Sequence, residues 1–114
     1  MRSLLIYLGD MLDAMDKIQE FTAGMSFEEF SQDEKTISAV RDKFSILGEA
    51  VKNVPDDIRR KYPDIAWKDM AGMRDILTHA YYRTDLNLVY TASVKRIPVE
   101  RAHIAKVYEE LKNR

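Results

Sequence analysis

Cysteine is absent from the 114-residue chain, which excludes a disulfide framework, a zinc ribbon and a cysteine nucleophile. Only two histidines occur, His79 and His103, so a histidine-rich metal site within one chain is not expected. Long apolar runs are missing too, because the longest extends only from Leu4 to Leu8, and a membrane-spanning helix needs roughly 20 residues. The chain reaches Asp10 too soon for a secretory signal. We therefore expect a soluble cytoplasmic protein with no resident metal or cofactor.

An excess of charge of one sign is also missing. The chain has 18 Lys and Arg against 19 Asp and Glu, a net charge of −1, so its composition does not indicate a nucleic-acid partner. The halves differ, however, with a net charge of −6 over residues 1–57 and +5 over residues 58–114. This difference is either scatter between helices or a basic surface that faces a polyanion. Apolar residues make up 46% of the chain, enough for one core, so we expect a single domain over residues 1–114.

Glycine and proline are scarce, at four and three residues, and helical periodicity dominates the first half. Apolar residues at three- and four-residue steps predict a helix over residues 3–23, ended near Gly24. Ser26 and Glu29 have the spacing of a capping box and predict a short helical turn. A heptad-like apolar stripe predicts a second long helix over residues 33–53; it consists of Ile37, Val40, Phe44, Leu47 and Val51.

The second half begins with a connector over residues 54–65, in which Pro55 starts a short helix and Pro63 stops it. A third helix is predicted over residues 66–82, and Gly72 inside it would allow another backbone to approach closely. Thr84 can cap a fourth helix over residues 84–95. Pro98 opens a fifth, with Ile104, Val107, Tyr108 and Leu111 on one face. These patterns predict an all-α up-and-down bundle of four to five helices.

One segment of the third helix combines residues that suit chemistry on a phosphodiester. Asp75 and His79 are four positions apart, so the carboxylate can fix the imidazole tautomer and raise the pKa of the imidazole. Arg74 and Tyr81 are seven apart, two turns along one helix. A guanidinium can hold phosphate oxygens in a bidentate manner, and an imidazole can move a proton near neutral pH.

An ordinary helix surface with an ion pair explains the same spacing. One Arg and one His also lack the second acid or base that ester cleavage usually needs. Pairing of two copies of this helix across a two-fold axis would bring two Arg74 and two His79 side chains into one cleft, which is a reason to expect a homodimer.

Two other features, His103 and the basic run at residues 59–61, are explained by ordinary structural roles. His103 has no comparable neighbours, and we interpret it as a surface or packing histidine. The basic run of Arg59, Arg60 and Lys61 is either a solvated helix end or a nucleic-acid contact, and the former is the commoner case. Neither feature adds to the candidate site.

The sequence resembles the HepT-like branch of the HEPN superfamily. The phrases that carry the resemblance are ILGEAVK, KYPDIAWKDMAGMRD and an Arg-x4-His-x-Tyr pattern formed by Arg74, His79 and Tyr81. The first helix and the DLNLVY stretch fit as well, so the resemblance extends over nearly the whole chain.

The resemblance implies a helical bundle that dimerises and cleaves RNA without metal, with Arg74 and His79 as catalytic residues in an interfacial cleft. It also implies a toxin that is paired with an MntA-like minimal nucleotidyltransferase antitoxin, which transfers AMP to Tyr81 and silences the toxin. Asp75 follows the arginine as a supporting residue, a role that we infer from its spacing to His79. Tyr81 could instead be a core or interface aromatic residue.

Three hypotheses follow for the function. The first is an endoribonuclease toxin that acts on RNA and not on DNA or a membrane. The second is a non-catalytic helical adaptor that binds and regulates a nucleotidyltransferase, and the third is a structural dimer. Cleavage of RNA by the wild type that is lost in an Arg74 variant would separate the first hypothesis from the other two.

Overall fold

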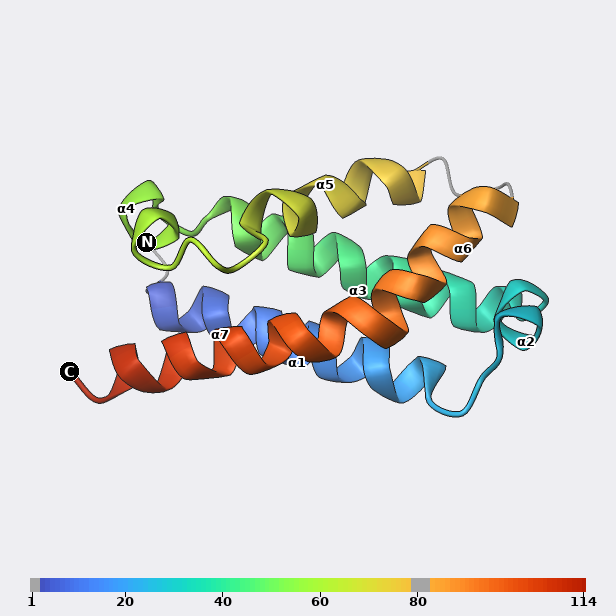
Figure 1. Ribbon diagram of the computed structural model, residues 1–114, viewed down its shortest axis with the longest axis horizontal. Helices are drawn as coiled ribbons and strands as arrows, with labels where there is room; N and C mark the ends of the chain where they lie inside the picture. Colours follow the sequence, from blue (N-terminus) through green and yellow to red (C-terminus); the bar gives the residue numbers. More distant parts are fainter. Residues whose placement is uncertain (1–2, 79–82) are drawn as a thin grey trace.

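The computed structural model describes residues 3–78 and 83–114, and in these ranges the chain is helical with no strand (Figure 1). The long helices are α1 (Leu4–Thr22), α3 (Glu34–Lys52), α5 (Trp67–Thr78) and α7 (Ile97–Lys112). The shorter helical elements are α2 (Phe27–Ser31), α4 (Asp56–Lys61), α6 (Arg83–Thr91) and the π-helical turn η1 (Ala92–Arg96). The predicted all-α class is therefore confirmed.

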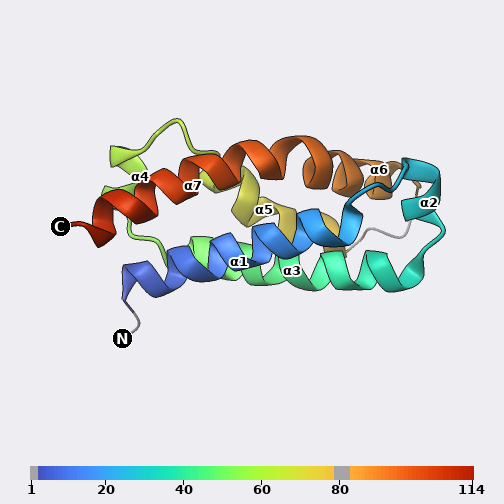
Figure 2. The same cartoon turned by 90° about the horizontal axis from the view of Figure 1, so that it is seen from below.

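The helices run up and down along a body of 45 × 25 × 25 Å. Figures 1 and 2 show α1 and α3 side by side, with the start of α1, the end of α7 and α4 at one end of the bundle and α2 at the other. Helix α3 is central, because it packs against α1 on one side and against α5 on the other, while α7 packs against α1. Helix α5 is thus joined to α1 through α3.

The apolar stripes predicted from the sequence form the core. The largest fully buried side chains come from α1, α2, α3, α6 and α7; they include Met11, Met15, Phe30, Phe44, Leu47, Val89 and Ile104. Burial of apolar side chains is the dominant favourable term in folding, so these stripes fix how the helices pack.

Local signals set the helix ends. The Ser26 hydroxyl accepts from the Glu29 N–H at 3.1 Å, and the Glu29 carboxylate accepts from the Ser26 N–H at 2.9 Å, which confirms the capping box. Gly24 follows α1 with φ of +74°, a conformation that favours glycine. Arg59 donates to the Val54 and Val51 carbonyls at 3.2 and 2.7 Å and so caps the end of α3. This first residue of the basic run therefore has a structural role.

Pro98 lies in the first turn of α7, which confirms that it opens this helix. The chain does not leave the helical path between α6 and α7, however, because η1 joins the two helices directly. Proline lacks an N–H, and its ring clashes with the carbonyl four residues earlier, here that of Val94. The wider π-helical turn, in which the Ile97 N–H donates to the Ala92 carbonyl, accommodates the proline without a break.

The close approach that Gly72 would allow is not made within the described part of the chain. Apart from its two chain neighbours and the backbone of its own helix, nothing described lies within 4 Å of the place where a Cβ on Gly72 would be. A close approach is made instead at Gly48 on α3, where a Cβ would lie 3.4 Å from the Arg74 Cβ and 3.5 Å from the Ala71 carbonyl oxygen. Gly48 therefore sets the separation of α3 and α5.

Candidate functional site

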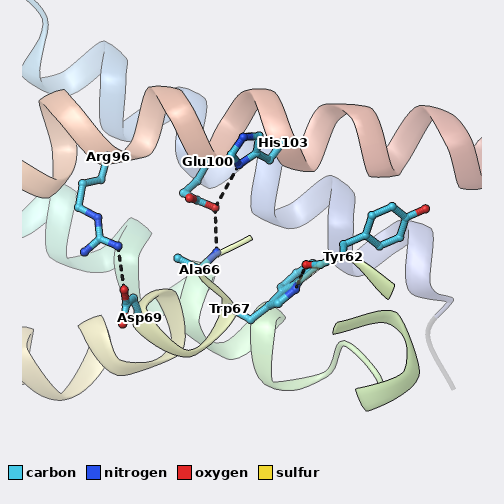
Figure 3. Close-up of polar contacts among 7 residues, drawn as sticks. All are labelled: Tyr62, Ala66, Trp67, Asp69, Arg96, Glu100 and His103. Carbon is cyan, nitrogen blue, oxygen red and sulfur yellow. Dashed lines mark hydrogen bonds and ion pairs between the residues drawn. The ribbon is translucent and has the colours of Figure 1, made fainter. Parts of the chain in front are cut away.

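Helix α5 carries Arg74 and Asp75 of the candidate site, and its first turn is anchored by polar contacts (Figure 3). The Glu100 carboxylate on α7 accepts the Ala66 N–H at 3.2 Å and so caps the start of α5. The Trp67 indole N–H donates to the Tyr62 carbonyl at 3.0 Å. A carboxylate at this end also suits the positive end of the helix dipole. The start of α5 is therefore fixed to both α7 and the connector before it.

A second contact joins α5 to the α6–α7 side. Arg96 Nη2 donates to the Asp69 carboxylate at 2.8 Å (Figure 3). Behind this ion pair lies a cavity of about 20 Å³, room for about one water molecule, lined in part by Phe44, Met70 and Ile97. Two polar contacts, Glu100 with Ala66 and Arg96 with Asp69, therefore join α5 to the η1–α7 segment beside a small cavity.

Arg74 lies on the exposed part of α5, with 44% of its side chain accessible. Its Nη1 donates to Glu49 Oε2 on α3 at 2.5 Å. The base of the same side chain lies against Gly48, whose missing Cβ leaves room for it. A charged guanidinium is thus presented at the surface by two consecutive residues of α3.

Asp75 is exposed beside Arg74, as its position on the helix requires. The other two predicted site residues, His79 and Tyr81, lie outside the described residues. The Asp75–His79 pair and the grouping of Arg74 with His79 and Tyr81 therefore remain predictions.

The second histidine lies elsewhere. His103 on α7 is half-buried, and its Nδ1 is 3.8 Å from Glu100 Oε2, beyond hydrogen-bond distance. Figure 3 marks this contact with a dashed line, but among the described residues the nitrogen has no hydrogen-bond partner. His103 is thus beside the anchored start of α5.

No set of three or more His, Asp or Glu side chains in residues 3–78 and 83–114 is grouped so that it could hold a metal ion. In the same ranges, no helix combines the length and the apolar character that crossing a bilayer requires.

Sequence reasoning does not identify the contact between Glu49 and Arg74. Glu49 lies in the ILGEAVK phrase, where the sequence pattern indicates no site residue. The available signal was Gly48, a small residue that interrupts an apolar helix face and is followed directly by a carboxylate. Its partner is 25 positions away on another helix, so spacing along one helix could not identify the pair.

Comparison with known proteins identifies the family. The model of the ribonuclease HepT-like family matches residues 11–107. The chain is 41% identical over 101 residues to "Probable ribonuclease HepT" of Thermococcus cleftensis, an alignment that covers 89% of this chain and 92% of that protein. It is 36% identical over 105 residues to "Putative RNase MJ0127" of Methanocaldococcus jannaschii, covering 92% and 87%. No solved structure matches significantly.

The all-α bundle defines the class of fold, and the matches define the family within it. The chain belongs to the ribonuclease HepT-like family. The predicted family and the predicted ribonuclease class are confirmed.

Proposed function

We propose that this protein is an endoribonuclease toxin that cleaves RNA without a metal ion, using Arg74 and His79. The observation that carries the proposal is the exposed guanidinium of Arg74 on α5, which is held by Glu49 on α3. Arg74 is the first residue of the Arg-x4-His-x-Tyr pattern in the sequence. The HepT-like family and the ribonuclease names of the relatives support the same reaction class.

The proposed chemistry needs only groups that the chain and its substrate supply. The ribose 2′-hydroxyl attacks the adjacent phosphorus and gives its proton to one His79, which acts as the base. The bond from phosphorus to the 5′-oxygen breaks, and a second His79 protonates that oxygen. Arg74 binds the non-bridging oxygens, where charge grows in the transition state. The products are a 2′,3′-cyclic phosphate and a 5′-hydroxyl.

Two copies of His79 require a homodimer with α5 near the two-fold axis. Two exposed apolar side chains support this arrangement, Ile76 on α5 at 37% exposure and Ile46 on α3 at 39%. Gly72 offers a further place where a second copy can approach closely, since no described atom outside its own helix backbone and its chain neighbours lies within 4 Å of a Cβ placed there. Light scattering should give a dimer at micromolar concentration, and a monomer would contradict the proposal.

The proposed partner is an MntA-like nucleotidyltransferase that transfers AMP from ATP to the Tyr81 hydroxyl, with release of pyrophosphate. The attached phosphodiester would pair with Arg74 and occupy the place of the RNA phosphate. Intact mass spectrometry after incubation with ATP, magnesium and the nucleotidyltransferase should show added adenylyl groups, which are absent from Tyr81→Phe. Modification at another residue, or full activity of the modified protein, would contradict this part.

One experiment separates the enzyme from a non-catalytic adaptor. Purified wild type and Arg74→Ala are incubated with cellular RNA, and the ends of the products are mapped. The enzyme predicts cyclic phosphate ends from the wild type and none from the variant. Equal products from both proteins would show that Arg74 is not catalytic, and an absence of products from both would favour the adaptor.

A further inference from the structure

The ion pair between Glu49 and Arg74 joins two helices at the candidate site. Glu49 Oε2 and Arg74 Nη1 are 2.5 Å apart, and both side chains are well exposed, at 60% and 44%. Exposed ion pairs contribute little to stability, because water and salt screen the charges. Helices α3 and α5 pack together through the apolar core instead, to which Phe44 on α3 and Met70 on α5 both belong. A contribution to stability therefore does not explain why Glu49 and Arg74 form this ion pair.

Helix α3 holds the Arg74 side chain at both of its ends. Gly48 lets the base of the side chain approach, since a Cβ there would be 3.4 Å from the Arg74 Cβ. Glu49, the next residue, binds the guanidinium at the tip. An unrestrained arginine samples many rotamers, and ordering it at the moment of substrate binding costs conformational entropy. Contacts at the base and the tip reduce that cost in advance.

We propose that Glu49 is a positioning residue for Arg74, an inference that rests on the ribonuclease function proposed above. A guanidinium has five N–H donors in a planar fork, so a carboxylate at Nη1 fixes the plane in which the other donors meet a phosphate. Glu49 does not bind the RNA, because its own negative charge repels phosphate oxygens. It acts through the orientation of Arg74 alone.

This role predicts a separation of kcat from KM. Orientation matters most in the transition state, so Glu49→Ala should lower kcat by about 10- to 100-fold. The KM for RNA should stay the same or fall, because removal of a negative charge favours a polyanion. Glu49→Gln keeps an oxygen that can accept from Arg74, so it should restore part of the lost kcat. A rise in kcat in both variants would instead show that Glu49 competes with the substrate and would overturn the proposal.

The chain offers a matched control. Asp16 on α1 accepts two hydrogen bonds from Arg101 on α7, at 2.9 and 3.3 Å, and this pair is also exposed and also joins two helices. Asp16→Ala should leave kcat and KM unchanged. Its melting temperature should shift about as much as that of Glu49→Ala. An equal loss of kcat in both variants would show a general effect of breaking ion pairs and would overturn the positioning role.

A second readout does not depend on cleavage. The ¹⁵N relaxation of the Arg74 Nε–Hε group reports how rigidly the guanidinium is held. Wild type and Asp16→Ala should give a high order parameter, and Glu49→Ala a clearly lower one. An unchanged order parameter in Glu49→Ala overturns the positioning role whatever the activity. A wild type that is rigid at Arg74 but cleaves no RNA contradicts the proposed function and not the contact.

Discussion

Helices α1 and α5 belong to the same bundle, but they bury their side chains differently. Helix α1 buries one stripe along most of its length, at Leu8, Met11, Ala14, Met15, Ile18 and Thr22. Helix α5 buries Trp67 and Met70 near its start, is half-buried over residues 71–73 and is exposed over residues 74–76. Helix α1 therefore contributes to the core along most of its length. Helix α5 is packed against the core near its start and exposes charged side chains further along.

The first and largest expected effect concerns the exposed part of α5. Arg74→Lys keeps the charge but loses the planar fork that holds two phosphate oxygens. We expect the rate of RNA cleavage to fall by about 10²- to 10³-fold. The melting temperature should change little, because the side chain is exposed. The measurement is single-turnover cleavage beside a thermal scan, and near-wild-type turnover would show that Arg74 is structural.

The matching change on α1 should have the opposite result. Met15 is fully buried, so Met15→Ala leaves a cavity and should lower the free energy of unfolding by about 2–5 kcal/mol. The catalytic rate of the molecules that remain folded should be close to that of the wild type. Urea unfolding gives the first quantity, and cleavage well below the melting temperature gives the second. A Met15→Ala protein with unchanged stability and a reduced catalytic rate would contradict the view that α1 acts in stability and α5 in catalysis.

Much of this distinction could be predicted from the sequence. The helices predicted over residues 3–23 and 33–53 are observed at Leu4–Thr22 and Glu34–Lys52, because their apolar stripes are long and their ends have local signals. Arg74 and Asp75 were selected from a short motif on α5, and both are exposed there. Local periodicity and capping were sufficient for these results.

Other features depend on contacts between distant residues. The Glu49–Arg74 pair and the cap of α5 by Glu100 join residues 25 and 34 positions apart, so no local pattern encodes them. Pro98 does open α7, but a proline in the first turn of a helix gives no sign of the π-helical turn that joins α6 to α7 without a break.

A smaller effect is expected at Gly72. A glycine within a helix costs roughly 0.5–1 kcal/mol relative to alanine. No described atom outside the helix's own backbone and the chain neighbours of Gly72 lies within 4 Å of the added Cβ. Gly72→Ala should therefore stabilise the monomer by about that amount. At Gly48 the added Cβ would meet the Arg74 Cβ, so Gly48→Ala should gain less. Urea unfolding compares the two variants, and a lower dimer fraction in Gly72→Ala alone would place the interface at α5.

The smallest effect concerns α3, the helix against which both α1 and α5 pack. The Thr36 N–H donates to the Asp33 carboxylate at 3.0 Å and lowers the pKa of Asp33 below its usual 3.8. Because the folded-state pKa is lowered, this stabilisation is present above about pH 3.8 and is lost as the pH falls through the folded-state pKa.

Asp33→Ala should therefore melt slightly below the wild type at pH 7, and the difference should shrink in acid. Asp33→Asn is the control, because asparagine also caps a helix but does not titrate. Thermal scans between pH 7 and pH 3 measure both variants, and a difference that is independent of pH would rule out the charged cap.

The central claim is that this chain cleaves RNA without a metal ion through Arg74 and His79. The most direct test is a ribonuclease assay on cellular RNA in EDTA, with the wild type beside His79→Ala. We predict cleavage by the wild type and none by the variant, with little change in the melting temperature of the variant. Cleavage that persists in His79→Ala, or that EDTA abolishes in the wild type, would contradict the account.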